Sequence, residues 1–208
     1  AVRYCERAKK AGADAVLVVT PYYNKPSDEG IFRHFEAVSK VGIPVVVYNI
    51  QGRTGRNIET SLLERIVQLP NMVAVKEASG NVSQMMDVIA KIKLKNPDFA
   101  VLSGDDSLSL PLIAAGGDGV ISVVSNIAPT EVTNLVQSAL NDDMSKAREL
   151  HYKLLPFFKA AFVDGNPSSI KYAMSTKGMI KPCVRLPLVE VKESAKSVIE
   201  NALKECNL

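Results

Sequence analysis

A lysine within an apolar run is the residue of this sequence best suited to carbonyl chemistry. Lys76 lies in the segment 73–78, which reads VAVKEA. Burial in such a segment disfavours the charged ammonium, lowers the pKa of the lysine and leaves a neutral amine that can attack a carbonyl carbon. The sequence therefore predicts either a Schiff-base lysine or an ion pair of Lys76 with a nearby carboxylate, such as Glu77 or Asp105.

Two side chains at the end of another apolar run are candidates for the same chemistry. Tyr48 ends the run that starts at Val45, and its phenol could move protons to and from a bound intermediate. Alternatively, its hydroxyl bonds a backbone group, as in most buried tyrosines. Arg53 follows in the segment 51–55, which reads QGRTG. Its guanidinium could hold a substrate carboxylate through two parallel hydrogen bonds, or it could be solvated on a loop.

Short apolar runs must position these side chains. They are rich in β-branched residues and too short for helices, which predicts strands at 16–20, 45–49, 73–77, 101–105 and 120–124. Their apolarity is continuous, which is typical of strands buried on both faces in a parallel sheet. The first four strands start 29, 28 and 28 residues apart. This spacing predicts βα repeats, either in a doubly wound sheet or in a (β/α)8 barrel.

Helical patterns occupy the rest of the chain. A helix is expected to end near Gly12, a second to be capped by Ser27, and a third to start at Ser83. Beyond the last strand we expect helices at 130–140, 144–162, 168–177 and 190–204, with a kink at Pro156. This order predicts a partial barrel over residues 1–128 and a helical region over residues 129–208.

Polar motifs follow the expected strands, where parallel βα architectures collect their reactive residues. The strand ends carry TPYYN at 20–24, YN at 48–49, KE at 76–77 and SGDD at 103–106. No glycine-rich phosphate-binding motif is present, which disfavours a nucleotide-binding sheet. In this order and spacing the motifs resemble those of the dihydrodipicolinate synthase family, and the resemblance covers nearly the whole chain.

The resemblance implies an α/β fold, the (β/α)8 TIM barrel of the class I aldolase type with additional C-terminal helices. Family members usually begin with three further βα units, so we expect a truncated chain with about five of the eight strands, units 4 to 8. The activity implied is a Schiff-base condensation of pyruvate with L-aspartate semialdehyde to 4-hydroxy-tetrahydrodipicolinate, in lysine (diaminopimelate) biosynthesis. No metal or organic cofactor is implied.

The resemblance also implies roles for individual residues. Lys76 matches the lysine that forms the pyruvate Schiff base, and Tyr48 matches the central tyrosine of a proton relay. Tyr23 matches a tyrosine that reaches across a dimer into the partner's site, which implies a homodimer or homotetramer. The remaining matches are Arg53, Thr54, Gly104 and Ile121 as substrate-binding positions, with Arg53 on the semialdehyde carboxylate, and Tyr22 as part of an allosteric lysine site.

Two alternatives to this function stay open. Sister enzymes on the same scaffold, such as N-acetylneuraminate lyase or a keto-deoxy sugar acid aldolase, share the tyrosine and the lysine. The loop at 52–55, GRTG, favours a short substrate with its own carboxylate. The second alternative is a catalytically silent fragment with a structural or interaction role, because the expected missing units carry the threonine pair of the relay.

Composition excludes several other classes of function. The formal net charge of +3 comes from 25 basic and 22 acidic residues that are mixed along the chain, so neither nucleic acid nor a membrane is an expected partner. Three cysteines without CxxC spacing and two distant histidines disfavour structural zinc. The apolar runs are far shorter than the roughly 20 residues that span a bilayer, and a cytoplasmic location is expected.

Overall fold

The computed structural model describes all residues from Ala1 to Leu208. The chain forms two compact units, Ala1–Ile121 and Ser122–Leu208. No helix in the structure is both long enough and apolar enough to traverse a bilayer. Every residue expected to take part in catalysis or substrate binding lies in the first unit. The division into a partial barrel at 1–128 and a helical region at 129–208 stays a prediction.

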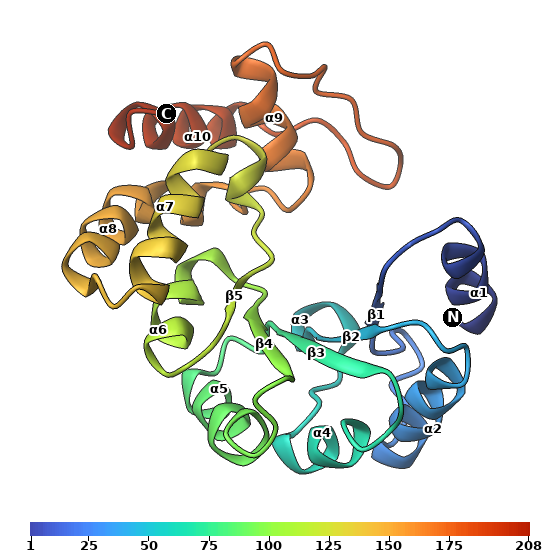
Figure 1. The fold of residues 1–208 in the computed structure, drawn as a ribbon. Helices are drawn as coiled ribbons and strands as arrows, with labels where there is room; N and C mark the ends of the chain where they lie inside the picture. The colour runs from blue at the N-terminus through green and yellow to red at the C-terminus, as the bar shows by residue number, and fades with distance from the viewer. The chain divides into compact units, whose positions relative to one another are not determined.

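A five-stranded parallel sheet organises the first unit (Figure 1). Its strands are β1 (Val16–Val19), β2 (Val45–Asn49), β3 (Met72–Glu77), β4 (Ala100–Ser103) and β5 (Gly119–Val120). They lie side by side in the order β1-β2-β3-β4-β5. A doubly wound sheet reverses its strand order at a switch point, whereas a barrel sheet runs in sequence. The sequential order therefore selects the barrel topology from the two predicted ones.

The fifth strand is shorter than predicted. It ends at Val120, although the amide of Ile121 still donates to the carbonyl of Ser103 at 2.9 Å. The amide of Ser125 then donates to the Ser122 hydroxyl at 2.8 Å, and a 3-10 turn follows at Val124–Asn126. This side-chain bond and the turn replace strand pairing, so the apolar run at 120–124 does not continue as a strand.

Helices between the strands cover one face of the sheet. They are α2 (Asp28–Ser39), α4 (Thr60–Ile66), α5 (Val82–Val88), which continues as a π-helical turn at Ile89–Lys93, and α6 (Ser109–Ala114). The short helix α3 (Gln51–Thr54) lies in the loop after β2, and α1 (Val2–Lys10) precedes β1. Figure 1 shows α2, α4 and α5 along the same side of the strands. Right-handed crossovers between sequential parallel strands require this arrangement.

Burial alternates along the strands because only this face is packed against helices. Val45, Val47 and Val75 are fully buried, together with Phe35 of α2 and Ile66 of α4. On the opposite face, Leu17 is 47% exposed, and Tyr48 and Lys76 are half-buried. The prediction that both faces of the strands are buried is therefore wrong for this unit. The less covered face is the one that presents the candidate chemistry.

Side-chain caps fix where two of these helices start. The Ser27 hydroxyl accepts from the amide of Gly30 at 3.3 Å, which confirms the predicted cap of α2. α5 starts at Val82, one residue earlier than predicted, because Asn81 provides the cap and accepts from the amide of Gln84 at 3.2 Å. Both caps satisfy amides that have no partner within the helix.

The second unit is helical. It contains α7 (Pro129–Leu140), α8 (Met144–Ala160), α9 (Ser168–Thr176) and α10 (Glu193–Glu205), around buried residues that include Leu135, Leu154, Phe157 and Ile199. α8 runs through Pro156 as one helix. α10 begins at Glu193, three residues later than predicted, because the amide of Lys192 donates to the Asp164 carboxylate at 2.9 Å and holds the backbone extended there.

Candidate active site

Lys76 and Tyr48 lie next to each other on the less covered face of the sheet. The register of β2 and β3 pairs Tyr48 with Lys76, and neighbouring residues in register point to the same side of a sheet. The Lys76 Nζ lies 4.3 Å from the centroid of the Tyr48 ring. Strand pairing alone thus places an amine against a phenol ring.

Burial shifts the pKa values of both groups. It lowers the pKa of Lys76, and the nearby positive charge of Arg53 acts in the same direction, while the carboxylate of Asp106 opposes the shift. Burial also raises the pKa of the Tyr48 phenol, and Arg53 opposes that change. Near neutral pH the site therefore favours an uncharged amine more than water does, beside a protonated phenol.

The carboxylates first considered as ion-pair partners of Lys76 bond to other groups. One oxygen of Glu77 accepts from the amide of Ser79 at 2.6 Å, and the other accepts from Asn49 Nδ2 at 3.0 Å. Asp105 accepts from both the amide and the hydroxyl of Ser107, at 2.8 and 2.7 Å. The negative charge that acts on Lys76 is that of the buried Asp106. Asp106 is the last residue of the SGDD motif, and no feature of the sequence favours it over Asp105 as a partner of Lys76.

The loop after β2 carries Arg53 on the short helix α3. Arg53 is exposed, yet its charge acts on the pKa values of both Lys76 and Tyr48. Thr54 is buried, and its hydroxyl lies 3.1 Å from the carbonyl of Ile50 and 2.8 Å from that of Arg56. The structure therefore uses the Thr54 side chain to hold the shape of the loop that presents Arg53.

Gly104 and Ile121 lie at the ends of the neighbouring strands. The amide of Gly104 donates to the carbonyl of Glu77 at 2.7 Å. A Cβ atom at position 104 would lie 2.6 Å from the Cβ of Ala78 and 3.0 Å from the Cε of Lys76, which is closer than side chains pack. Glycine is thus required where the backbone passes the Lys76 side chain, and Ile121 continues the sheet just beyond β5.

Tyr22 and Tyr23 lie on the loop between β1 and α2 and are not packed within the chain. Tyr22 is 67% exposed and Tyr23 is 94% exposed. Tyr23 also has a φ of 70°, in the left-handed region that bulky residues rarely adopt. The strand pairing that brings Lys76 and Tyr48 together does not include these two side chains.

A buried polar cluster on the opposite, helix-covered face was missed by the sequence analysis. We call Asn49, Asn57, Glu77 and Gln84 the Glu77 cluster. Asn49 directly follows Tyr48, Glu77 directly follows Lys76, and the two are paired in the register of β2 and β3. The signal that could have revealed it was a polar residue at the end of each of two apolar strands, next to each candidate catalytic residue.

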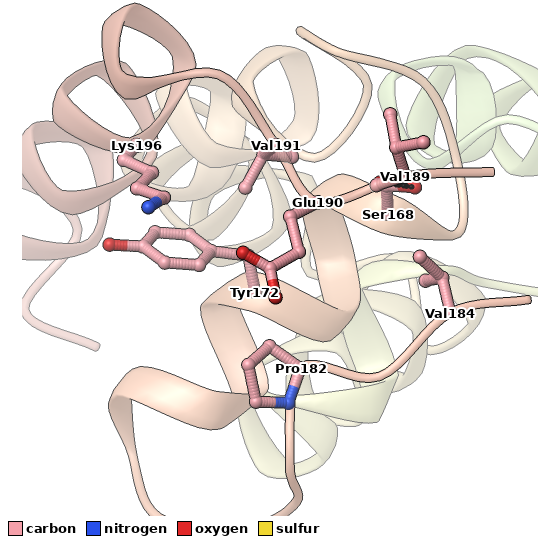
Figure 2. A pocket seen from close by; sticks show the side chains of 8 residues that line it. All are labelled: Ser168, Tyr172, Pro182, Val184, Val189, Glu190, Val191 and Lys196. Atoms are coloured by element: carbon pink, nitrogen blue, oxygen red, sulfur yellow. Dashed lines mark hydrogen bonds between the residues drawn. The ribbon is translucent and has the colours of Figure 1, made fainter.

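A small cavity of about 50 Å³ lies in the second unit (Figure 2). It is bounded by α9, α10 and the segment 182–191, and it contains none of the predicted site residues. The hydroxyl of Tyr172, one of the lining residues, donates to Glu200 Oε1 at 2.6 Å, a bond that raises the pKa of Tyr172 to about 12. The structure contains no cluster of three or more His, Cys, Asp or Glu side chains arranged to hold a metal ion.

Comparison with known proteins places this geometry among one group of enzymes. The model of the dihydrodipicolinate synthetase family matches residues 1–206. The 4-hydroxy-tetrahydrodipicolinate synthase of Protochlamydia amoebophila (strain UWE25) is 49% identical over 206 residues, which cover 99% of this chain and 69% of that protein. These matches rest on nearly the whole of the present sequence.

Solved structures agree in fold as well as in sequence. The dihydrodipicolinate synthase from Thermotoga maritima superposes with a TM-score of 0.96 at 42% identity, over 99% of this chain and 70% of that one. The chloride-inhibited dihydrodipicolinate synthase from Acinetobacter baumannii, complexed with pyruvate, gives a TM-score of 0.95 at 36% identity, over 99% and 70% of the two chains.

Proposed function

The chain belongs to the dihydrodipicolinate synthetase family, and we propose that it is a class I aldolase-like lyase that forms 4-hydroxy-tetrahydrodipicolinate in lysine (diaminopimelate) biosynthesis. The proposed substrates are pyruvate, the molecule held by the A. baumannii structure, and L-aspartate semialdehyde. The fold is that of the family's (β/α)8 barrel, of which this chain contains five strands.

One observation carries the proposal at the level of chemistry. Lys76 is a half-buried amine whose pKa is lowered by burial, and its Nζ lies 4.3 Å from the centroid of the Tyr48 ring. A Schiff-base enzyme needs an amine that is uncharged near neutral pH and a neighbouring group that can exchange protons. The pairing of β2 and β3 places an amine with a lowered pKa beside a phenol, which supports the proposal.

The proposed reaction starts with the Lys76 amine. It attacks the ketone carbon of pyruvate, and loss of water leaves an imine. A proton then leaves the methyl carbon, which gives an enamine, and this carbon attacks the aldehyde of the second substrate to form the new carbon–carbon bond. The amino group of the second substrate finally attacks the imine carbon, which closes the ring and releases Lys76.

Each neighbouring residue has a proposed part in these steps. The Tyr48 phenol, protonated near neutral pH, gives and takes the protons of imine and enamine formation. The Arg53 guanidinium holds the carboxylate of the semialdehyde. Gly104 leaves room for Lys76, and Ile121 is proposed to line the substrate pocket beside Lys76. Thr54 keeps Arg53 in place through its bonds to the loop backbone.

Tyr22 and Tyr23 have proposed roles outside this cluster. The 94% exposure of Tyr23 supports a role for its hydroxyl in the site of a second copy, within a homodimer or homotetramer. Tyr22 is proposed to contact lysine at an allosteric site. We place the reaction in the cytoplasm, because all three cysteines are free thiols, which suits a reducing compartment.

Borohydride trapping tests the proposed function directly. The protein is incubated with pyruvate and sodium borohydride, which reduces an imine to a stable amine, and the adduct is mapped by mass spectrometry. We expect one adduct on Lys76, its loss in Lys76→Arg, and its retention in Lys93→Arg. Lys93 is a suitable control because it is also largely buried but is paired with Asp118 at 2.7 Å.

The same preparation separates the remaining alternatives. A synthase consumes L-aspartate semialdehyde once the pyruvate imine has formed, whereas the sister aldolases require a sugar or sugar-acid aldehyde instead. Absence of an adduct from folded protein would favour the catalytically silent alternative. An adduct on Lys76 without turnover of L-aspartate semialdehyde would contradict the proposed second substrate.

A further inference from the structure

The Glu77 cluster lies directly behind the two proposed catalytic residues. Lys76 and Glu77 are consecutive in β3, so their side chains point to opposite faces of the sheet. The same holds for Tyr48 and Asn49 in β2. Glu77 and Asn49 are both fully buried beneath the helices, although neither belongs to the apolar core. A buried carboxylate is costly unless its oxygens are fully hydrogen-bonded, so its presence needs a reason.

Every contact of the Glu77 carboxylate is with a donor. Oε1 accepts from the amide of Ser79 at 2.6 Å, and Oε2 accepts from Asn49 Nδ2 at 3.0 Å and from Gln84 Nε2 at 3.3 Å. The Asn49 amide cannot turn over, because its oxygen already accepts from the amide of Ile58 at 2.9 Å. The surroundings therefore require a group that only accepts hydrogen bonds, which is a carboxylate and not an amide.

These bonds connect the segments that carry the site. Through Asn49 the carboxylate joins β3 to the end of β2, directly behind the pair formed by Lys76 and Tyr48. Asn49 also binds Asn57 at 2.8 Å and the amide of Ile58, at the end of the loop that begins at Ile50 and carries Arg53. Gln84 extends the cluster to α5 and binds the carbonyl of Ile58 at 3.1 Å.

We propose that Glu77 is a positioning residue for catalysis, which sets the register of Lys76 against Tyr48 and of the Arg53 loop through Asn49 and Gln84. The inference rests on the proposed function, because the register matters only if Lys76 and Tyr48 react together. Rigid support from behind is the means by which active sites hold reacting groups in a productive geometry, and a displacement of about 1 Å costs on the order of 100-fold in rate.

Glu77→Gln is the sharpest test of this role. The variant keeps the shape of the side chain but replaces one acceptor with a donor, which then faces either the amide of Ser79 or the amides of Asn49 and Gln84. We expect the rate of borohydride-trapped imine formation and kcat to fall by roughly 10- to 100-fold. The KM for pyruvate should change much less, because no substrate contact is removed.

Asp118→Asn is the matched control. Asp118 also accepts from a backbone amide of the sheet, that of Val101 at 2.7 Å, and from Lys93 Nζ at 2.7 Å. It lies at the start of β5, away from the strand ends that carry the site, so the same chemical change there is expected to lower stability without slowing imine formation. Both variants are compared by circular dichroism and urea denaturation, and rates are normalised to folded protein.

A rescue variant separates positioning from general destabilisation. In N49D/E77Q the carboxylate moves from β3 to β2, where it can accept from the amide that now occupies the end of β3. We expect this double variant to recover part of the lost rate. If Glu77→Gln does not fold, Gln84→Leu replaces it, since that change removes one donor to the carboxylate but leaves the bond between the strands; it should slow imine formation by a smaller factor.

The possible results distinguish this inference from the proposed function. If the wild-type protein forms no adduct with pyruvate, the proposed function is wrong and the positioning role with it. If the wild-type protein forms the adduct and folded Glu77→Gln, or Gln84→Leu in its place, does so at the same rate, only the positioning role is overturned. Equal slowing in Glu77→Gln and Asp118→Asn also overturns it, because the effect would then come from stability alone.

Discussion

Arg53 acts on the candidate site through its charge. It is exposed on the loop after β2, yet its positive charge lowers the pKa of Lys76, in the same direction as burial. The same charge opposes the rise that burial causes in the pKa of Tyr48. One side chain therefore shifts the pKa values of both the amine and the phenol.

Removal of this charge shifts the pH dependence of imine formation. In Arg53→Gln the pKa of Lys76 rises, so a smaller fraction of the amine is neutral at a given pH and the rate profile moves toward higher pH. We expect this shift in borohydride trapping with pyruvate alone, from about pH 6 to 10, together with a higher KM for L-aspartate semialdehyde. Arg56→Gln is the control, since Arg56 is on the same loop but pairs with Asp28. Identical profiles for wild type and Arg53→Gln would show that the charge does not reach Lys76.

At the scale of elements, capping side chains determine where the helices beside the site begin. Ser27 caps α2, which packs against α4 on the buried face of the sheet. Ser27→Ala should lower the free energy of unfolding by about 1 kcal/mol, because the amide of Gly30 loses its acceptor, while Ser27→Asn should retain most of the stability. Urea denaturation measures both. A loss in the asparagine variant as large as that in the alanine variant would contradict a capping role.

Elements with a strong local pattern could be predicted from the sequence. β1 to β4 were placed to within two residues at either end, because β-branched runs bounded by polar residues are characteristic of buried strands. The short helix α3 was not predicted. Its four residues have no amphipathic pattern, and the helix depends on the bonds of Thr54 to the loop backbone and on Gly55, which ends it with a φ of 69°.

The residues on the two faces of the sheet at the candidate site also differed in how far the sequence could predict them. Lys76, Tyr48 and Arg53 could be proposed as site residues because their residue types are unusual in or just after apolar runs. The Glu77 cluster left only a weak signal, a polar residue after each apolar run, because Asn49 and Glu77 are 28 residues apart and their bond exists only once β2 and β3 are in register. The apolar residues that precede them in the sequence made Lys76, Tyr48 and Arg53 candidates, whereas the contacts of the Glu77 cluster depend on the pairing of β2 and β3.

For the whole molecule, the exposure of Tyr23 leads to a test of assembly. If Tyr23 serves the site of a partner, Tyr23→Phe and Lys76→Met disable different parts of a shared site. Co-expression of the two inactive variants should then restore about a quarter of the wild-type activity, since half of randomly formed dimers are mixed and each mixed dimer has one intact site. Activity no higher than that of the single variants, despite mixed dimers in native mass spectrometry, would argue against a shared site.

Two histidines with buried ring nitrogens make stability depend on pH. Burial lowers the pKa of both His34 and His151, and His34 Nε2 and His151 Nδ1 have no hydrogen-bond partner. Below about pH 6.5 the unfolded chain binds more protons at these positions than the folded chain, so the free energy of unfolding falls as the pH decreases toward the folded-state pKa values. We expect His151→Leu to weaken this dependence in urea denaturation at about pH 7.5 and 5.5. If the pH dependence of the free energy of unfolding is unchanged in His151→Leu, other groups than His151 cause it.

The sequential order of β1 to β5 also has a consequence for the kinetics of folding. Each strand from β2 onward pairs with the strand made just before it, as in the pairs of Val16 with Val45 and of Val45 with Met72. Such pairings close loops of about 30 residues at most, and the entropy lost in loop closure grows only slowly with loop length. Since the N-terminal part of a chain emerges first during synthesis, the sheet can grow by one strand and one helix at a time on the ribosome. β2 and β3 would then be joined, and Lys76 set beside Tyr48, before β5 and the C-terminal helices have been translated.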